Sequence, residues 1–384
     1  MQVSHRLIAL GAASAIFIGA CSGSAATPAP TAAPATQAPA TAAPATEAPS
    51  AAATEAPSTA ATLKACVAFD TGGLGDKGFN DLAKKGLDDA KAAGFDTAYS
   101  EAQGATDYAA NIQRLLDEGC QSIITVGFNQ AQATVEATLA NTDVAFAQVD
   151  ATWDEKANGK TPANFTGLDF QIDEAATLAG YVAAGVSKSK VIGTYGGQQF
   201  PGVTRFMDGY YAGIKIYNEK KGATAKLLGW DAATQEGTFV GGDNPWGDAA
   251  KGEQLAQTFM DQGADFVAPV AGGTGNGSIK AMQAAGKWAI GVDTDQAVSM
   301  SEYSKTILTS AEKRIDVAVL ETFKKNAGGD MGGENFIGTL ANGGVRMSPF
   351  HDLASLVPAD LQAEVDQLAK DIASGAIKIA DYLK

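Results

Sequence analysis

The sequence predicts an α/β protein with two doubly wound lobes, each a mostly parallel sheet with helices on both faces. From Leu63 onward, short apolar runs alternate with helical stretches, which is the pattern of repeated strand–helix units. About ten strands are expected, which is more than one core of this type usually holds. The alternation also restarts after Asp169. These observations favour two lobes whose facing strand ends form a cleft for a small ligand.

The expected elements follow one another along the chain. Strands are predicted at 64–70, 96–100, 122–127, 144–149, 165–168, 190–195, 225–230, 265–270, 288–292, 305–309 and 336–340. Helices are predicted at 79–93, 107–118, 130–140, 172–186, 202–220, 247–262, 276–285, 311–327 and 358–374. Several of these helices are followed by a glycine, a residue that commonly ends helices, namely Gly94, Gly119, Gly263 and Gly286.

The composition excludes several classes of function. The 384 residues carry a formal net charge of −15 and show no basic run, so nucleic acid is not the expected partner. His5 and His351 are the only histidines, which leaves little for a Ser-His or Cys-His pair, and we interpret His351 as structural. No His-Glu-x-x-His or Cys-x-x-Cys spacing occurs, so we expect no metal and no cofactor.

The first 62 residues predict an export signal and a tether. Residues 1–20 contain the apolar run LIALGAASAIFIGA, which is too short to span a bilayer. The run from Ile18 to Cys21 resembles a bacterial lipobox, which implies a lipidated Cys21; an ordinary signal peptide with a coincidental cysteine is the alternative. Residues 21–62, rich in Pro, Ala and Thr, predict a disordered tether. We therefore expect a domain anchored by lipid on the extracytoplasmic side of the cell membrane.

Two further cysteines, Cys66 and Cys120, accompany apolar strand patterns. Buried free thiols are the simpler interpretation, because unpaired cysteines are among the most buried residues. A strand order of 2-1-3 would make their strands neighbours, so a disulfide formed in an oxidising compartment stays open as the alternative.

Acidic, amide, glycine and aromatic residues gather where the predicted strands end. The first half contributes Asp70, Phe79, Asn80, Gly127, Phe128 and Asp150. The second half contributes Phe200, Trp246, Gly273, Asp293 and Asp295. Because the carboxyl ends of parallel strands carry the binding loops, these residues are candidates for one site.

The loop after the first strand has the spacing Gly73-x-Gly75-x-x-Gly78, which matches a dinucleotide fingerprint. A pyrophosphate there would face two carboxylates, Asp70 and Asp76, with Lys77 as the only nearby cation, which is unfavourable. We interpret Asp76 and Lys77 as a solvated loop pair. Carboxylates and amides instead suit a ligand that offers hydroxyls, and flat aromatic rings suit a base or a sugar face. A neutral nucleoside or sugar is therefore the predicted ligand.

The chain from about residue 63 onward resembles the basic membrane protein (BMP) family of lipoproteins, which are substrate-binding components of ABC importers and include purine nucleoside receptors. The resemblance is carried by FDTGGLGDKGFND, GFNQAQA, FAQVDA, QQFPGVTRFMDGYYAG, NPWGDAAKGEQLAQTFMDQGADFVAPVAGGTGNG, GVDTDQ, TSAEKRIDVAV and GGVRMSPFHD, in this order. It implies a type I periplasmic-binding-protein fold with a three-segment hinge. The expected lobes are residues 63–169 completed by about 305–330, and residues 170–304 completed by about 331–384.

The resemblance also implies roles for single residues. Asp70, Phe79, Asn80 and Asp150 are expected to contact a nucleoside, Asp293 its ribose, and Trp246 the second face of its base. Structural roles are the alternatives: Asp70 as a turn cap, Phe79 as the first core residue of its helix, Asp150 as a hinge or cap residue, and Trp246 as a helix staple.

The expected function is capture of a nucleoside, with a purine as its base, and delivery to an ABC permease by a protein that is a monomer and not an enzyme. A ligand that bridges both lobes would favour the closed state. An extracellular nucleoside or sugar hydrolase that uses two carboxylates, or a ligand-sensing receptor module, are the alternatives.

Overall fold

The computed structural model describes residues 63–384, and these form one compact unit. The predicted signal at 1–20, the lipidation of Cys21 and the tether at 21–62 lie outside the described residues. No helix of residues 63–384 is both long and apolar enough to cross a membrane.

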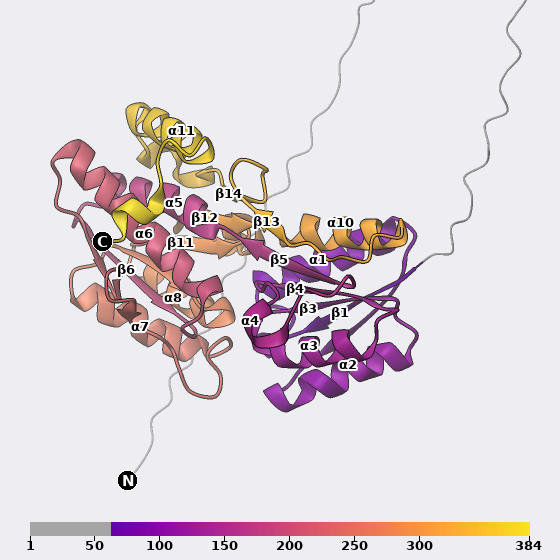
Figure 1. Cartoon of the computed structure of the whole chain (residues 1–384). Coiled ribbons are helices and arrows are strands. Elements are labelled where there is room, and N and C mark those ends of the chain that lie inside the picture. Colours follow the sequence, from indigo (N-terminus) through magenta and orange to yellow (C-terminus); the bar gives the residue numbers. More distant parts are fainter. Residues whose placement is uncertain (1–62) are drawn as a thin grey trace, which may run out of the picture. The chain divides into compact units, whose positions relative to one another are not determined.

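The first lobe is built on a parallel six-stranded sheet in the order β13-β5-β4-β3-β1-β2 (Figure 1). Its strands are β1 (Lys64–Phe69), β2 (Asp96–Glu101), β3 (Ser122–Val126), β4 (Ala145–Val149), β5 (Phe165–Phe170) and β13 (Phe336–Gly338). Its helices are α1 (Phe79–Ala92), α2 (Tyr108–Asp117), α3 (Ala131–Ala140), α4 (Glu155–Asn158) and α10 (Ile315–Ala327). The central strands β3 and β4 are buried along their whole length, as expected for parallel strands with helices on both faces.

The second lobe has a sheet of the same size in the order β14-β12-β11-β10-β6-β7, parallel except for β14. Its strands are β6 (Val191–Gly196), β7 (Lys226–Leu228), β10 (Phe266–Val270), β11 (Trp288–Asp293), β12 (Ile307–Lys313) and β14 (Val345–Met347). Its helices are α5 (Ile172–Val186), α6 (Pro201–Lys221), α7 (Ala249–Asp261), α8 (Gly272–Ala284), α9 (Gln296–Ser299) and α11 (Ala359–Ala373). A short hairpin of β8 (Trp230–Asp231) and β9 (Glu236–Gly237) completes it.

The chain crosses between the two sheets three times, as expected from the resemblance, after β5, after β12 and after β13. The boundaries differ from the prediction. Residues 307–313 belong to the second sheet, although 305–330 was expected to complete the first lobe. Residues 336–338 belong to the first sheet, although 331–384 was expected to complete the second lobe. Both crossings therefore lie later in the chain than the sequence pattern indicates.

Helices α5 and α6 pack closely against each other, and this packing fixes the position of the first turn of α6. A Cβ atom on Gly213 would lie 2.0 Å from the backbone oxygen of Thr177, and one on Gly180 would lie 2.5 Å from that of Tyr210. Only glycine permits so close an approach, because any side chain would force the helices apart. The first turn of α6, which contains Gly202, is thereby placed beside the candidate site.

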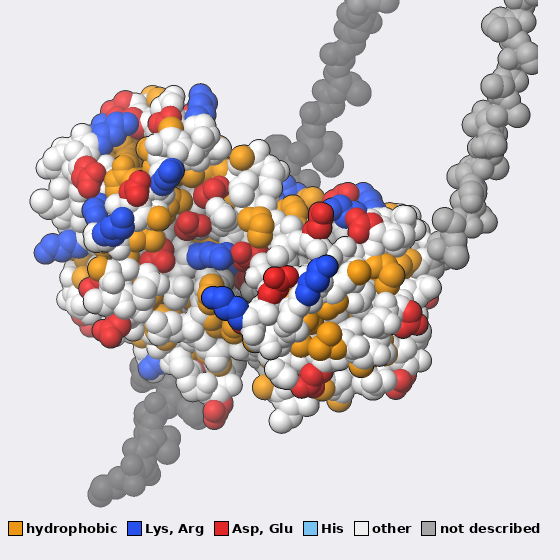
Figure 2. All heavy atoms as spheres, viewed as in Figure 1, with side chains coloured by type: hydrophobic (Ala, Val, Ile, Leu, Met, Phe, Trp, Pro, Cys, Tyr) orange, Lys and Arg blue, Asp and Glu red, His pale blue; other side chains and the backbone are white. Residues whose placement is uncertain are grey.

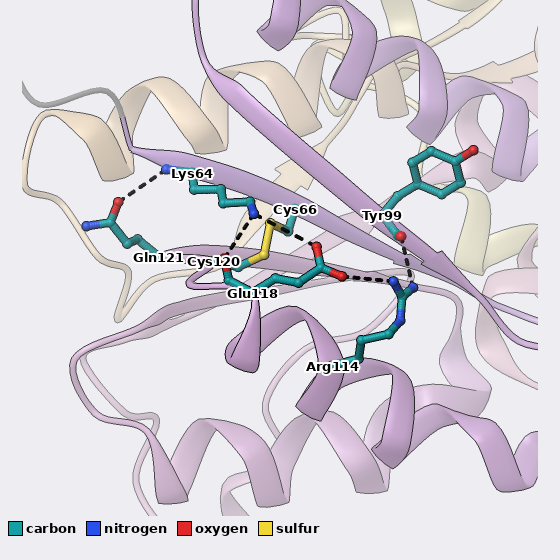
Figure 3. The surroundings of a disulfide bond; sticks show 7 residues. All are labelled: Lys64, Cys66, Tyr99, Arg114, Glu118, Cys120 and Gln121. Carbon is teal, nitrogen blue, oxygen red and sulfur yellow. Dashed lines mark hydrogen bonds and ion pairs between the residues drawn. A yellow bond between two sulfur atoms is a disulfide. The ribbon is translucent and has the colours of Figure 1, made fainter.

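A disulfide joins Cys66 in β1 to Cys120, which precedes β3 (Figure 3). The interpretation as free thiols is therefore wrong, and the strand order β3-β1-β2 brings the two cysteines together with their Cα atoms 6.0 Å apart. Both cysteines are buried. The bond ties together β1 and β3, two of the three first-lobe strands whose following loops line the site.

The protein surface carries charges of both signs. On the face shown in Figure 2, Lys and Arg side chains are interspersed with Asp and Glu side chains, and no patch of one sign covers it. The net charge of −15 is thus not concentrated on this face.

Candidate functional site

A narrow cleft with about 50 Å³ of free space is lined by residues from both lobes. All six residues of the main predicted set line it, namely Asp70, Phe79, Asn80, Asp150, Trp246 and Asp293. Gly127, Phe128 and Phe200 line it as well. The structure therefore brings residues from seven separate segments to one place; their contact with a ligand stays a prediction.

Two residues of the predicted set lie elsewhere. Asp295 does not line the cleft, since its Oδ2 atom lies 2.6 Å from Nε2 of His351, in the segment after β14. This contact supports the structural interpretation of His351. Gly273 lies in the first turn of α8 behind Gly272, which lines the cleft in its place.

The loop that follows β1 forms a network around Asn80. Asp70 Oδ1 accepts hydrogen bonds from the backbone nitrogen of Gly72 at 2.9 Å and from Asn80 Nδ2 at 3.0 Å. Asp70 therefore caps the turn, as the structural alternative predicted, and it also lines the cleft. Asn80 is 2% exposed, and its Oδ1 atom has no partner among the described residues.

Asp76 is buried, so its interpretation as part of a solvated pair is wrong. Its two oxygens accept hydrogen bonds from the backbone nitrogens of Gly78, Asn80 and Asp81 at 2.8–3.2 Å and from Asn80 Nδ2 at 3.2 Å. Asp76 thus organises the loop and the start of α1, while Lys77 stays exposed with φ at 61°.

A buried lysine lies between one aspartate of each lobe. Lys313, at the end of β12, places Nζ 2.6 Å from Asp150 Oδ2 and 3.7 Å from Asp293 Oδ1. Asp150 follows β4 and Asp293 ends β11, which are equivalent strands in the two sheets. Both aspartates have left-handed backbone angles, with φ at 61° and 65°. Such angles cost a non-glycine residue about 1–2 kcal/mol and are common where a side chain must be aimed at a site.

Burial shifts the acid–base behaviour of the cleft. It raises the pKa of Asp70 to about 6, although the hydrogen bonds from Asn80 and Gly72 oppose this shift. It raises the pKa of Asp293 to about 7, with Lys313 opposing. Burial also raises the pKa of Asp150, offset in part by the charge of Lys313. The site therefore has an excess of carboxyl groups over cations, which disfavours an anionic ligand.

Aromatic rings line the same cleft. The Nζ atom of Lys313 lies 5.3 Å from the ring centre of Phe79 and 5.0 Å from that of Phe206. Phe128 of the first lobe stacks on Phe200 of the second, with ring centres 5.0 Å apart, and Phe200 in turn contacts Trp246 at 5.8 Å. The Nε1 atom of Trp246 is buried without a partner among residues 63–384. These rings offer flat apolar surface beside the carboxylates.

Comparison with known families supports this description. The model of the family described as "Bmp: ABC transporter substrate-binding protein PnrA-like" matches residues 63–234 and 240–382. The chain belongs to this family. The resemblance drawn from the sequence motifs is thereby confirmed.

Relatives in the Bmp family share about a quarter to a third of their residues with this chain. The ABC transporter nucleoside-binding protein BmpA of Lactococcus lactis subsp. cremoris is 28% identical, over 79% of this chain and 86% of that protein. Basic membrane protein A1 of Borrelia garinii is 28% identical, over 82% and 87%. An uncharacterized lipoprotein of Pyrococcus abyssi is 32% identical, over 73% and 68%.

Solved structures confirm the type I periplasmic-binding-protein fold. An ABC transporter solute-binding protein from Aeropyrum pernix K1 superposes with a TM-score of 0.71 and 25% identity, covering 82% of this chain and 92% of that one. A solute-binding protein from Actinobacillus succinogenes with bound D-allose has the same fold, at a TM-score of 0.56 and 11% identity. This Bmp family chain is thus a substrate-binding protein of the ABC transporter class.

Lys313, the one lysine that lines the cleft of this Bmp family protein within the described residues, was not among the predicted site residues. The sequence pattern predicted a strand that ends at residue 309 and a helix that begins at residue 311, which placed Lys313 in a helix. In the structure β12 continues to Lys313, as far as the end of its neighbour β11. The sequence does contain a signal for Lys313, because the alternation of strands and helices predicts binding residues at strand ends. The predicted end of β12 was too early, so Lys313 was not recognised as such a residue. Phe206 and Gly202, in the first turns of α6, were missed as well.

Among the described residues, no group of three or more His, Cys, Asp or Glu side chains is arranged to hold a metal ion. The cleft offers carboxylates, an amide, one lysine and aromatic rings, which together can accept hydrogen bonds from a polar ligand and cover a flat ring.

Proposed function

We propose that this chain captures a nucleoside, with a purine as its base, in the cleft between its lobes and delivers it to a permease in the membrane. The observation that carries the proposal is the meeting of carboxylates and aromatic rings from both lobes in one cleft. A Bmp family relative that is named as a nucleoside-binding protein supports the same ligand class.

The chemistry of the cleft fits the parts of a nucleoside. Asp293 is proposed to accept hydrogen bonds from ribose hydroxyls, since an ionised carboxylate is a stronger acceptor than a neutral group. Phe79 and Trp246 are proposed to cover the two faces of the base, and each base–aromatic contact is worth about 1–3 kcal/mol. Asp70 and Asn80 are proposed to contact the edge of the base.

Few hydrogen bonds join the lobes at the rim of the cleft, which supports closure around a ligand. Asn276 Nδ2 donates to the backbone oxygen of Asp76 at 3.0 Å, and Ser299 Oγ donates to that of Lys77 at 2.9 Å. Asn129 Nδ2 donates to Gln198 Oε1 at 2.9 Å. These contacts are polar and partly exposed, so each contributes only about 0.5–1.5 kcal/mol. A ligand that touches both lobes would add the larger share of the closing free energy.

The proposal includes the setting in which the protein works. Lipidation of Cys21 would anchor the chain on the extracytoplasmic side of the membrane, and the tether at 21–62 would let a monomeric binding domain reach its permease. The disulfide between Cys66 and Cys120 supports an oxidising compartment.

The decisive experiment measures melting temperature and calorimetric affinity with nucleosides, free bases and sugars. Purine nucleosides are expected to raise the melting temperature most, because a ligand that binds only the folded state stabilises it by mass action. Chromatography of the same mixtures after long incubation is expected to show intact nucleoside. Release of free base would establish a hydrolase instead, and a lack of binding to every nucleoside would overturn the proposal.

A further inference from the structure

The amide group of Asn80 has a fixed orientation. Its Nδ2 atom donates to Asp70 Oδ1 at 3.0 Å and to Asp76 Oδ2 at 3.2 Å. Rotation of the amide by 180° would place its oxygen against both carboxylates, which offer no hydrogen to donate when ionised. Both hydrogens of Nδ2 are therefore used within the loop, and Oδ1 is the atom of this amide left for another partner.

That remaining oxygen is a buried acceptor without a donor. Asn80 is 2% exposed and lines the cleft, and Oδ1 has no hydrogen-bond partner in the described part of the chain. A buried acceptor left unpaired costs free energy comparable to a lost hydrogen bond, so a partner is expected to come from the ligand.

Asp70 adds a second acceptor at the same end of the cleft. Its Oδ1 atom is held by the backbone nitrogen of Gly72 and by Asn80, while Oδ2 accepts no hydrogen bond from residues 63–384. A Cβ atom on Gly127 would lie 2.5 Å from Oδ2, so only glycine leaves room beside this oxygen. The oxygens of Asp76, in contrast, are occupied by three backbone nitrogens and Asn80.

We propose that the first-lobe end of the cleft selects bases whose edge carries at least two donor hydrogens, so that guanosine or adenosine binds in preference to inosine. This inference rests on the proposed nucleoside function and specifies the base. The two free acceptors are Asn80 Oδ1, which is buried and unpaired, and Asp70 Oδ2, to which no residue of 63–384 donates; both can take a donor from the ligand. The unpaired Nε1 of Trp246 adds one donor, but every purine offers a ring nitrogen to it, so this group does not discriminate.

The purine ribosides form a series with the same sugar and different numbers of donors on the base. Guanosine has a ring N–H and an amino group on neighbouring atoms, and adenosine has one amino group with two hydrogens. Inosine has one ring N–H, and unsubstituted purine riboside has none. A site built to bond a donor rejects an analogue that lacks it, because its own polar groups then stay buried and unpaired.

Calorimetric titration of the full chain with these four ribosides tests the proposal. The tighter of guanosine and adenosine is expected to bind about 10- to 100-fold better than inosine, with purine riboside weaker again by a similar factor. If none of the four binds, the proposed function fails. If all bind within about threefold of one another, the nucleoside function stands and the base preference is wrong.

A pair of matched variants supplies a second test. Asp70→Asn keeps an oxygen for Gly72 and Asn80 but places an NH₂ group where Oδ2 was, so the affinity ratio of the best aminopurine riboside to purine riboside is expected to fall at least about tenfold. Asp293→Asn makes the same chemical change at the other lobe and is expected to weaken all four ribosides by one common factor. If this affinity ratio changes equally in Asp70→Asn and Asp293→Asn, or in neither, the proposal is overturned. Melting temperatures verify that both variants are folded.

Discussion

The two titrating aspartates of the cleft are expected to make the proposed nucleoside binding depend on pH. Burial raises the pKa of Asp293 to about 7 and that of Asp70 to about 6. If the bound ligand needs both groups ionised, affinity is lost as each takes up a proton. At about pH 5 the loss is about 100-fold from Asp293 and about tenfold from Asp70, because each pH unit below a pKa costs about a factor of ten.

The stability of the free protein is expected to change in the opposite direction. Both groups have a folded-state pKa above the ordinary aspartate value of 3.8, so the folded state holds more protons than the unfolded state between these values. The stabilisation that these two groups give the folded state is therefore complete below about pH 4. It is lost as the pH rises through about 6 for Asp70 and about 7 for Asp293. Acidification from about pH 8 to about pH 5 thus weakens binding while these two groups favour the folded state.

Titration calorimetry with guanosine across this pH range measures the effect, and melting temperature without ligand verifies the fold at each pH. Asp293→Asn removes the group with the higher pKa and is expected to leave only the tenfold loss that belongs to Asp70. An affinity that stays constant from about pH 8 to about pH 5 would refute the claim that ionised Asp70 and Asp293 accept hydrogen bonds from the ligand.

Three further outcomes follow from the same contacts. Phe79→Ala and Trp246→Ala are each expected to weaken nucleoside binding by about 1–3 kcal/mol, and unchanged calorimetric affinity in both would reject stacking. Lys313→Met leaves buried carboxylates unpaired and is expected to cost about 3–5 kcal/mol in urea unfolding; combining it with Asp150→Asn should restore part of this, and simple additivity would mean that the pair is not coupled. Replacing Cys66 and Cys120 by serine opens a link across 54 residues and is expected to cost about 4 kcal/mol, measured with the wild type in reductant as the control; a loss below about 1 kcal/mol would contradict the entropic argument.

The local sequence pattern was sufficient to predict the alternation of strands and helices, because apolar runs and the glycines that end helices are local signals. It failed at β12, whose seven residues are all buried although Thr309, Ser310, Glu312 and Lys313 are polar. The partners of these side chains come from other segments: Ser348 for Thr309, Gln296 for Ser310, Arg346 for Glu312, and Asp150 for Lys313. A polar run of this kind resembles an exposed helix until those partners are known, and this is why the strand end and Lys313 were misplaced.

The opposite error was made at Asp76. The stretch from Gly73 to Gly78 looks like a solvated loop, because glycine and charged residues dominate it. The structure buries Asp76 by turning three backbone N–H groups and Asn80 toward it. Hydrogen bonds to backbone within a loop leave no periodic trace in the sequence, so burial of this carboxylate could not be predicted. The disulfide could be predicted in part from the sequence, since the expected strand order already placed the strands of Cys66 and Cys120 side by side.

The repeated architecture of the lobes places Asp150 and Asp293 at equivalent positions, from which we expect them to perform different tasks. Each follows or ends the strand third from one edge of its sheet, and each is turned inward by a left-handed backbone angle. Lys313 distinguishes them, because its Nζ is 2.6 Å from Asp150 but 3.7 Å from Asp293. Asp150 also approaches the first turn of α6, where a Cβ atom on Gly202 would lie 2.8 Å from its Oδ2. We therefore expect Asp150 to hold the lobes together through protein contacts and Asp293 to keep hydrogen-bonding capacity for a ligand. On this expectation the same residue type serves closure on one side of the cleft and recognition on the other, because Lys313 lies closer to Asp150 than to Asp293.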